Sequence, residues 1–146
     1  MLRNSEGRMI FAFSESYGRV TSLQAEARAL CRGLQMCGLL GYAPTIVEGD
    51  SKVLIDAIQG YGSVPKAMLP VIHHIHQVSV AGISHQHIYR EGNAVADVLA
   101  SYGCDSNGFS LFLSFQSLPK SLRGLYNVDR LGAGSFRFFR RPHRAS

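Results

Sequence analysis

The sequence predicts one α/β domain in which helices flank a mixed sheet. Strand-like and helical segments alternate through the middle of the chain, and strands joined by a crossover helix pair in parallel. The first long strand follows a short turn at Asn4–Gly7, so it is expected to belong to an antiparallel hairpin. A chain of 146 residues with 46% apolar residues is long enough to bury one core.

The individual elements follow from the spacing of apolar residues. The predicted strands are the end of one at Met1–Arg3, then Arg8–Phe13, Thr45–Glu48 and Gly82–Tyr89. The predicted helices are Leu23–Leu40, Lys52–Gln59, Ala67–Val78 and Ala94–Tyr102. Asn93 is expected to cap the last helix with its side chain, and Gly103 is expected to end it.

Beyond Cys104 the pattern weakens. We therefore predict a domain over residues 1–103 and a weakly structured, basic extension over 104–146. From Lys120 onward the chain has seven basic residues and one acid, while residues 1–119 carry a net charge of −1. The segment FRFFRRPHR interleaves Arg with Phe, which suits a polyanion such as nucleic acid, and a solvated tail is the alternative.

Several classes of protein are disfavoured by the sequence. No apolar run reaches the ~18 residues of a membrane span, and the N-terminus does not resemble a signal peptide. An intracellular protein without a membrane partner is expected. The three cysteines, Cys31, Cys37 and Cys104, contain no C-x-x-C pair, which argues against a disulfide framework or a thiolate zinc site. They are expected to be small buried hydrophobes.

Three acids lie at the ends of predicted elements or beside their apolar faces. Glu26 lies near the start of the first helix, Asp50 follows the strand at Thr45–Glu48, and Asp97 lies near the start of the last helix. Carboxylates that converge from separate elements form the hard-oxygen site that Mg²⁺ or Mn²⁺ prefers. Each acid also has a plainer interpretation, as a solvated surface group or a helix-dipole acid.

Three blocks, AEARALCRGL, VEGDSKVLIDAI and SHQHIYREGNAVADVLA, resemble the type-1 ribonuclease H fold in the correct order. They are most similar to the ribonuclease H-like domains of plant retroelement-derived, reverse-transcriptase-like proteins. The resemblance covers roughly Leu2–Tyr102. It implies hydrolysis of the RNA strand of an RNA–DNA hybrid by two divalent metal ions, Mg²⁺ or Mn²⁺, held by four acids.

The resemblance assigns roles to individual residues. Glu26, Asp50 and Asp97 match three of the four metal-binding acids, and His87 matches a mobile histidine that aids product release; a plain strand histidine is the alternative. The resemblance matches Asn93 to a position that contacts the substrate or orients the site. Arg90 and Ser51 are further candidate nucleic-acid contacts, although a solvated Arg90 is equally compatible with the sequence.

The sequence departs from this family at its beginning. The family's first strand, the centre of a five-stranded sheet, carries a fourth aspartate in a D-G motif, and this chain has no matching segment. Met1–Arg3 matches only the end of the second strand. A truncated gene, a fragment or a degenerate copy would each explain the difference. We therefore expect an incomplete metal site and little cleavage, with a non-catalytic binding module or a non-functional fragment as alternatives.

Overall fold

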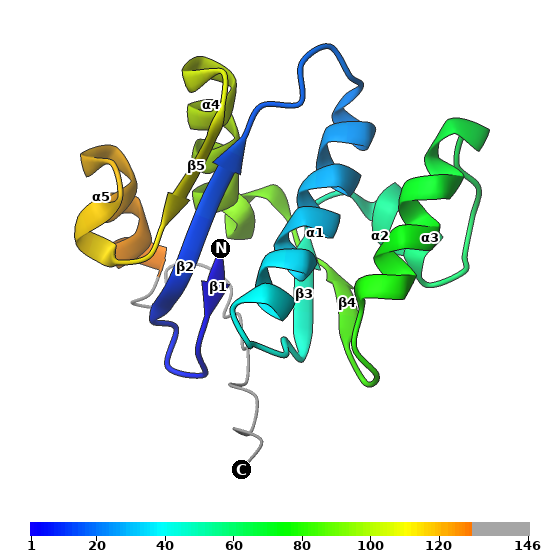
Figure 1. The fold of residues 1–146 in the computed structure, drawn as a ribbon, viewed down its shortest axis with the longest axis horizontal. Helices are drawn as coiled ribbons and strands as arrows, with labels where there is room; N and C mark the ends of the chain where they lie inside the picture. Colours follow the sequence, from blue (N-terminus) through cyan, green and yellow to red (C-terminus); the bar gives the residue numbers. More distant parts are fainter. Residues whose placement is uncertain (130–146) are drawn as a thin grey trace.

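The computed structural model describes residues 1–129 (Figure 1). Its strands are β1 (Leu2–Arg3), β2 (Met9–Glu15), β3 (Ile46–Gly49), β4 (Ser84–His87) and β5 (Phe109–Phe112). Its α-helices are α1 (Ser22–Leu39), α2 (Lys52–Ile58), α3 (Leu69–Val78), α4 (Ala94–Ser106) and α5 (Lys120–Val128). Short 3-10 turns, η1 (Lys66–Met68), η2 (Arg90–Asn93) and η3 (Phe115–Ser117), precede α3, α4 and α5. The mixed α/β class predicted from the sequence is confirmed.

The described strands pair in two separate ladders rather than in one continuous sheet. One ladder has the order β1-β2-β5, and both of its pairs are antiparallel. The other is the parallel pair β3-β4, with a register that runs from Ile46 opposite Ser84 to Gly49 opposite His87. The predicted hairpin and the predicted parallel neighbours are both present. In Figure 1, β1 and β3 lie on the inner sides of the two ladders.

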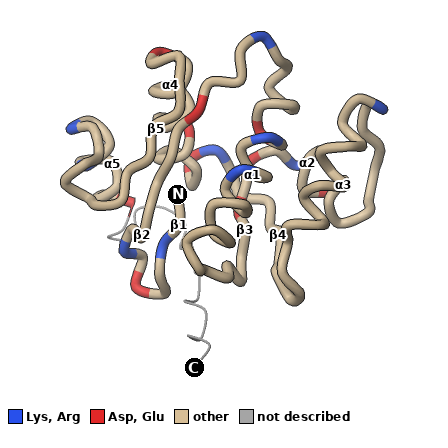
Figure 2. Tube along the Cα trace, viewed as in Figure 1, with Lys and Arg blue, Asp and Glu red and all other residues tan. Residues whose placement is uncertain are grey.

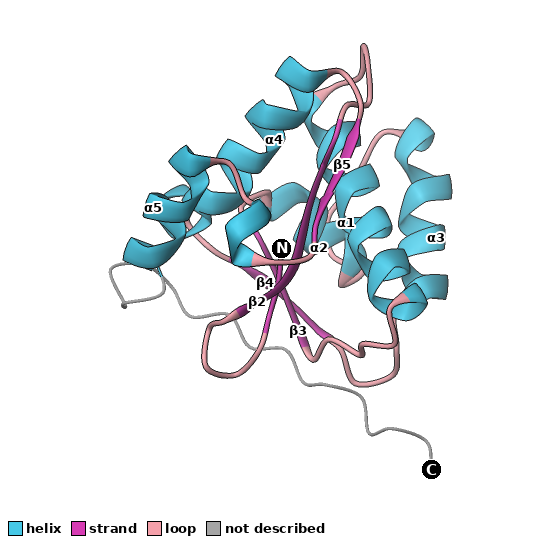
Figure 3. Cartoon of the chain, turned by 60° about the vertical axis from the view of Figure 1, so that its left-hand side comes forward, coloured by secondary structure: helices cyan, strands magenta, loops and turns pink. Residues whose placement is uncertain are grey.

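Helices cover both sides of the strands. Figure 3 shows α4 and α5 on one side, and α1 and α3 on the other. The larger core lies between α1, α2, α3 and β3, and a second core joins β2, α4, β5 and α5. Cys31 and Cys37 are buried as predicted, but Cys104 is exposed, so the prediction for that residue is wrong.

Helix α4 continues past the residue predicted to end it. Gly103 lies inside the helix, and Asn107, in the left-handed conformation with φ of 52°, is the C-cap. A Cβ atom at position 103 would lie 3.0 Å from the backbone N and O of Glu15. The glycine therefore allows α4 to pack closely on β2, and it does not stop the helix.

The segment after residue 103 contributes ordered elements. Strand β5 extends the β1-β2 ladder, and α5 buries Leu122 completely against the second core. Arg3 in β1 and Asp129 after α5 form an ion pair that is almost wholly buried. The basic residues Arg137, Arg140, Arg141 and Arg144 lie outside the described residues, so their predicted contact with nucleic acid stays a prediction. Within residues 1–129, no helix is long and apolar enough to cross a membrane.

Candidate functional site

The parallel pairing of β3 and β4 brings two of the predicted acids to one edge. Asp50 directly follows β3, which ends at Gly49 opposite His87, the last residue of β4. The chain then turns through η2 into α4, whose first turn contains Asp97. Carboxyl ends of parallel strands share one edge of a sheet, and ligands collect there. The prediction that Asp50 and the start of α4 lie together is confirmed.

The third acid reaches the same place from α1. A capping box between Thr21 and Gln24 begins this helix: the Thr21 hydroxyl accepts the Gln24 N–H, and the Gln24 side chain accepts the Thr21 N–H. Glu26 follows in the next turn, where the Ser51 side chain hydrogen-bonds its carboxylate. The Ser51 hydroxyl also accepts the Leu54 N–H at 3.3 Å and caps α2.

Arg90 supplies the cation of this region. Its Nε atom lies 3.7 Å from Asp50 Oδ2 and 3.9 Å from Asp97 Oδ2. The Asp50 side chain is 13% exposed, whereas that of Arg90 is 82% exposed. We call Glu26, Asp50, Asp97 and Arg90 the acid site. Figure 2 shows acidic and basic positions together in the middle of the molecule, among α1, α2 and α4.

Two of the three carboxylates, those of Glu26 and Asp97, have a raised pKa. The pKa of Glu26 is raised above 4.5, first by burial and then by the negative charge of Asp50. The pKa of Asp97 is raised by burial and by Asp50 as well, and Arg90 opposes the shift at both residues. The negative charge of Asp50 therefore acts on both of the other carboxylates.

The acids are not arranged as a preformed metal centre. Within residues 1–129, no three His, Cys, Asp or Glu side chains are grouped so that they could hold one ion. The carboxylate oxygens are the donor type that Mg²⁺ prefers. In this arrangement, however, the guanidinium of Arg90 provides the countercharge for Asp50 and Asp97.

The remaining predicted residues surround the acid site. The exposed His87 ends β4, and its ring meets the edge of the Tyr89 ring, with centroids 5.7 Å apart and planes at 74°. Asn93 precedes α4 as predicted, but its side chain makes no capping hydrogen bond, so that part of the prediction is wrong. The 3-10 turn η2 leads directly into α4 and replaces the extended backbone that such a cap requires. The roles assigned to His87, Asn93 and Ser51 stay predictions.

Three contacts were not predicted from the sequence. The ion pairs of Arg90 with Asp50 and Asp97 join η2 to the end of β3 and to α4. The hydrogen bond between Ser51 and Glu26 joins α2 to α1. Ser51 also caps α2, and nothing in the sequence indicated that its side chain would reach α1.

Replacement of Glu26 by Gln should stabilise the protein at neutral pH. A carboxyl group whose pKa is raised on folding costs stability above its unfolded pKa, and this cost is absent at lower pH. The gain should be a fraction of a kcal/mol, because solvent screens this half-exposed site. Thermal denaturation should show a higher melting temperature for E26Q at pH 7 and no difference near pH 3. Glu6, an exposed acid in the turn between β1 and β2, is the control. A rise in melting temperature of the same size in E6Q would contradict the explanation.

Comparison with known proteins agrees with the fold and the motifs. The family model described as "Reverse transcriptase-like" matches residues 1–103. A protein of Arabidopsis thaliana with a provisional ribonuclease H name is 30% identical over 138 residues, which cover 91% of this chain. The match spans only 22% of that relative, so this chain corresponds to about a fifth of its length.

A solved structure supports the same relationship. The N-terminal ribonuclease H domain of a Mycobacterium tuberculosis protein, determined as a fusion with maltose-binding protein, superposes with a TM-score of 0.56 at 26% sequence identity. The superposition covers 64% of this chain and 69% of that structure. With the family match over most of its length, the chain belongs to the reverse transcriptase-like family of ribonuclease H-like domains.

Proposed function

We propose that the 146-residue chain binds RNA–DNA hybrids at the acid site and does not cleave them. The single observation that carries the proposal is the position of Arg90, within 4 Å of both Asp50 and Asp97. An exposed guanidinium beside partly exposed carboxylates can turn toward a phosphate group of a nucleic acid. A nucleic-acid ligand presents such a phosphate at every nucleotide. The relatives' ribonuclease H names support a hybrid as the ligand.

The absence of cleavage follows from the number of acids. A two-ion phosphodiester hydrolase stabilises both the attacking and the leaving oxygen, and the resemblance assigns four carboxylates to that task. This chain contributes Glu26, Asp50 and Asp97, and two of these carboxylates already have Arg90 as a counter-ion. Hybrid binding, in contrast to cleavage, requires only the exposed surface of the acid site and the charge of Arg90.

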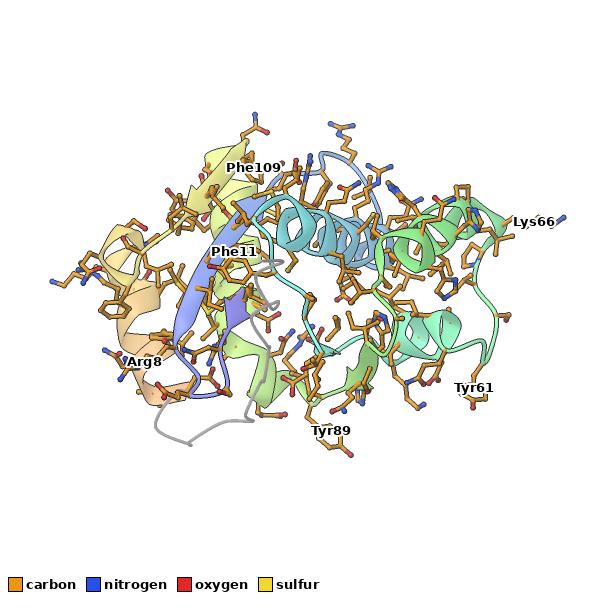
Figure 4. All side chains as sticks on the ribbon, turned by 60° about the horizontal axis from the view of Figure 1, so that its bottom comes forward. Arg8, Phe11, Tyr61, Lys66, Tyr89 and Phe109 are labelled. Carbon is orange, nitrogen blue, oxygen red and sulfur yellow. The ribbon has the colours of Figure 1, made fainter. Side chains whose placement is uncertain are left out.

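Fluorescence anisotropy with a labelled hybrid tests the binding. Replacement of Arg90 by Ala should weaken hybrid binding about fivefold or more. A phosphate contact is lost, and the negative charges of Asp50 and Asp97, without Arg90 as their counter-ion, then repel the phosphates of the hybrid. Replacement of Arg8 by Ala is the matched control, since this arginine is also exposed and lies in the β1-β2 turn (Figure 4). Equal weakening by the two substitutions, or no measurable binding by the unmodified chain, would contradict the proposal.

Divalent ions should bind weakly and in competition with Arg90. In a titration with Mn²⁺ followed by electron paramagnetic resonance, R90A should bind the ion several-fold more tightly than the unmodified chain. Removal of an exposed cation that pairs with the same carboxylates should improve the free energy of ion binding by roughly 1 kcal/mol, which corresponds to about fivefold in the dissociation constant. D50N should abolish the binding. Tight Mn²⁺ binding that is unchanged in R90A would show that Arg90 does not occupy the acids.

A further inference from the structure

Tyr89 is the most exposed tyrosine or phenylalanine in the described part of the chain. The residue is 79% exposed, ahead of Tyr61 at 67% and Phe109 at 47%. Aromatic rings dominate the energetics of cores and interfaces because of their large apolar area. The large apolar face of an exposed ring is available to a ligand, and the surroundings of Tyr89 indicate which ligand it fits.

The backbone that carries Tyr89 is held on both sides. The Ile88 N–H donates to the carbonyl of Gly49 at 2.9 Å, which fixes the preceding residue to the end of β3. The Tyr89 carbonyl accepts the Gly92 N–H at 2.9 Å, which fixes the turn that follows. The ring is thus presented from an anchored position at the junction of β4 and η2, so little conformational entropy remains to be lost on binding.

The ring also has a defined orientation beside the acid site. The edge-to-face contact with His87, with planes at 74°, restrains the Tyr89 side chain while most of its surface stays in water. The next residue is Arg90, which reaches Asp50 and Asp97. Figure 4 shows Tyr89 projecting from the surface, and Tyr61 projecting separately, near α2.

An exposed aromatic ring next to a cation fits a nucleobase joined to a phosphate. Stacking of a base on an aromatic side chain contributes about 1–3 kcal/mol, and it does not depend on the base. Inside a duplex both faces of each base are already stacked on neighbours. Away from the end of the duplex, an unpaired base therefore offers the free face that a paired base lacks. A hybrid with a single-stranded extension presents such a base directly beside a duplex.

We propose that Tyr89 stacks on an unpaired nucleobase next to the duplex, so that the preferred ligand is an RNA–DNA hybrid with a single-stranded extension. This inference rests on the proposed function, because it assigns a ligand class to the same site. Arg90 meets the phosphate at the junction, and Tyr89 meets the first base beyond it.

The test compares a blunt hybrid with one that carries a short extension whose first unpaired base is 2-aminopurine. The unmodified chain should bind the extended hybrid about tenfold more tightly than the blunt one and should quench the 2-aminopurine fluorescence. In Y89A the two affinities should become equal and the quenching should disappear. In Y89F both should be retained, because stacking needs the ring and not the hydroxyl.

Y61A is the matched control, since it removes another exposed tyrosine that lies apart from Tyr89 in Figure 4. The preference for the extension should be unchanged in this variant. A preference of the same size in Y89A and in the unmodified chain, or equal binding of the two hybrids by the unmodified chain, overturns the inference and leaves the proposed function standing. Failure of the unmodified chain to bind either hybrid overturns both.

Discussion

Joining a strand with an Asp-Gly pair to the N-terminus should convert this chain into an Mg²⁺-dependent hybrid ribonuclease. In the described residues, β1 and β3 are end strands of two separate ladders, and they lie on the inner sides in Figure 1. A strand paired with both would join the ladders and add a fourth carboxylate to the acid site. Metal-based stabilisation of charge contributes several kcal/mol, so cleavage should rise at least about a hundredfold over the unextended chain.

The controls for this experiment separate chemistry from folding. An extended chain with Asn in place of the added aspartate should fold in the same way and stay inactive. D50N in the active extended chain should abolish cleavage, since Asp50 is the most buried acid of those paired with Arg90. An extended chain that folds, as judged by circular dichroism and melting, but does not cleave would contradict the assignment of the acids.

Replacement of Leu122 by Ala should destabilise the whole domain by about 2–5 kcal/mol. Leu122 in α5 is fully buried in the core that also contains Val95 and Leu99 of α4. The cavity should therefore lower the melting temperature of the entire chain in a single transition. V128A is the control, because Val128 lies on the same helix and is 55% exposed, and it should change stability very little.

The same measurement tests the domain boundary predicted at residue 103. If the segment after this residue were a separate extension, L122A would leave the main transition unchanged. A loss of stability across the whole transition would instead place β5 and α5 in the same cooperative unit as the rest of the fold. The family match also ends at residue 103. The boundary itself stays a prediction, because a family match does not report which segments unfold together.

The local spacing of apolar residues in the sequence was sufficient to predict the elements that position the acid site. The apolar stripe of α1, the strands β3 and β4 and the start of α4 each follow a regular period, and their order implied a parallel pair. The convergence of Asp50 and Asp97 followed from that pairing. These predictions depend on neighbours within one element or on the connection between two adjacent elements.

Features that depend on individual backbone and side-chain contacts, rather than on a repeating pattern, were not predicted. A glycine near the end of a helical pattern resembles a helix stop, but Gly103 is required by the backbone of Glu15 in β2. The cap expected from Asn93 is replaced by a 3-10 turn. The ion pairs of Arg90 join residues 40 and seven positions apart in sequence, which periodicity does not report.

Binding and cleavage are separated in one sample that contains the unmodified 146-residue chain, a labelled RNA–DNA hybrid and Mg²⁺, with anisotropy and strand length followed together. We expect saturable binding that is weakened in R90A, with the RNA strand intact throughout. Mg²⁺-dependent cleavage that disappears in D50N would contradict this expectation. That result would mean that another acid, with Glu48 in β3 the nearest candidate in sequence, completes the site.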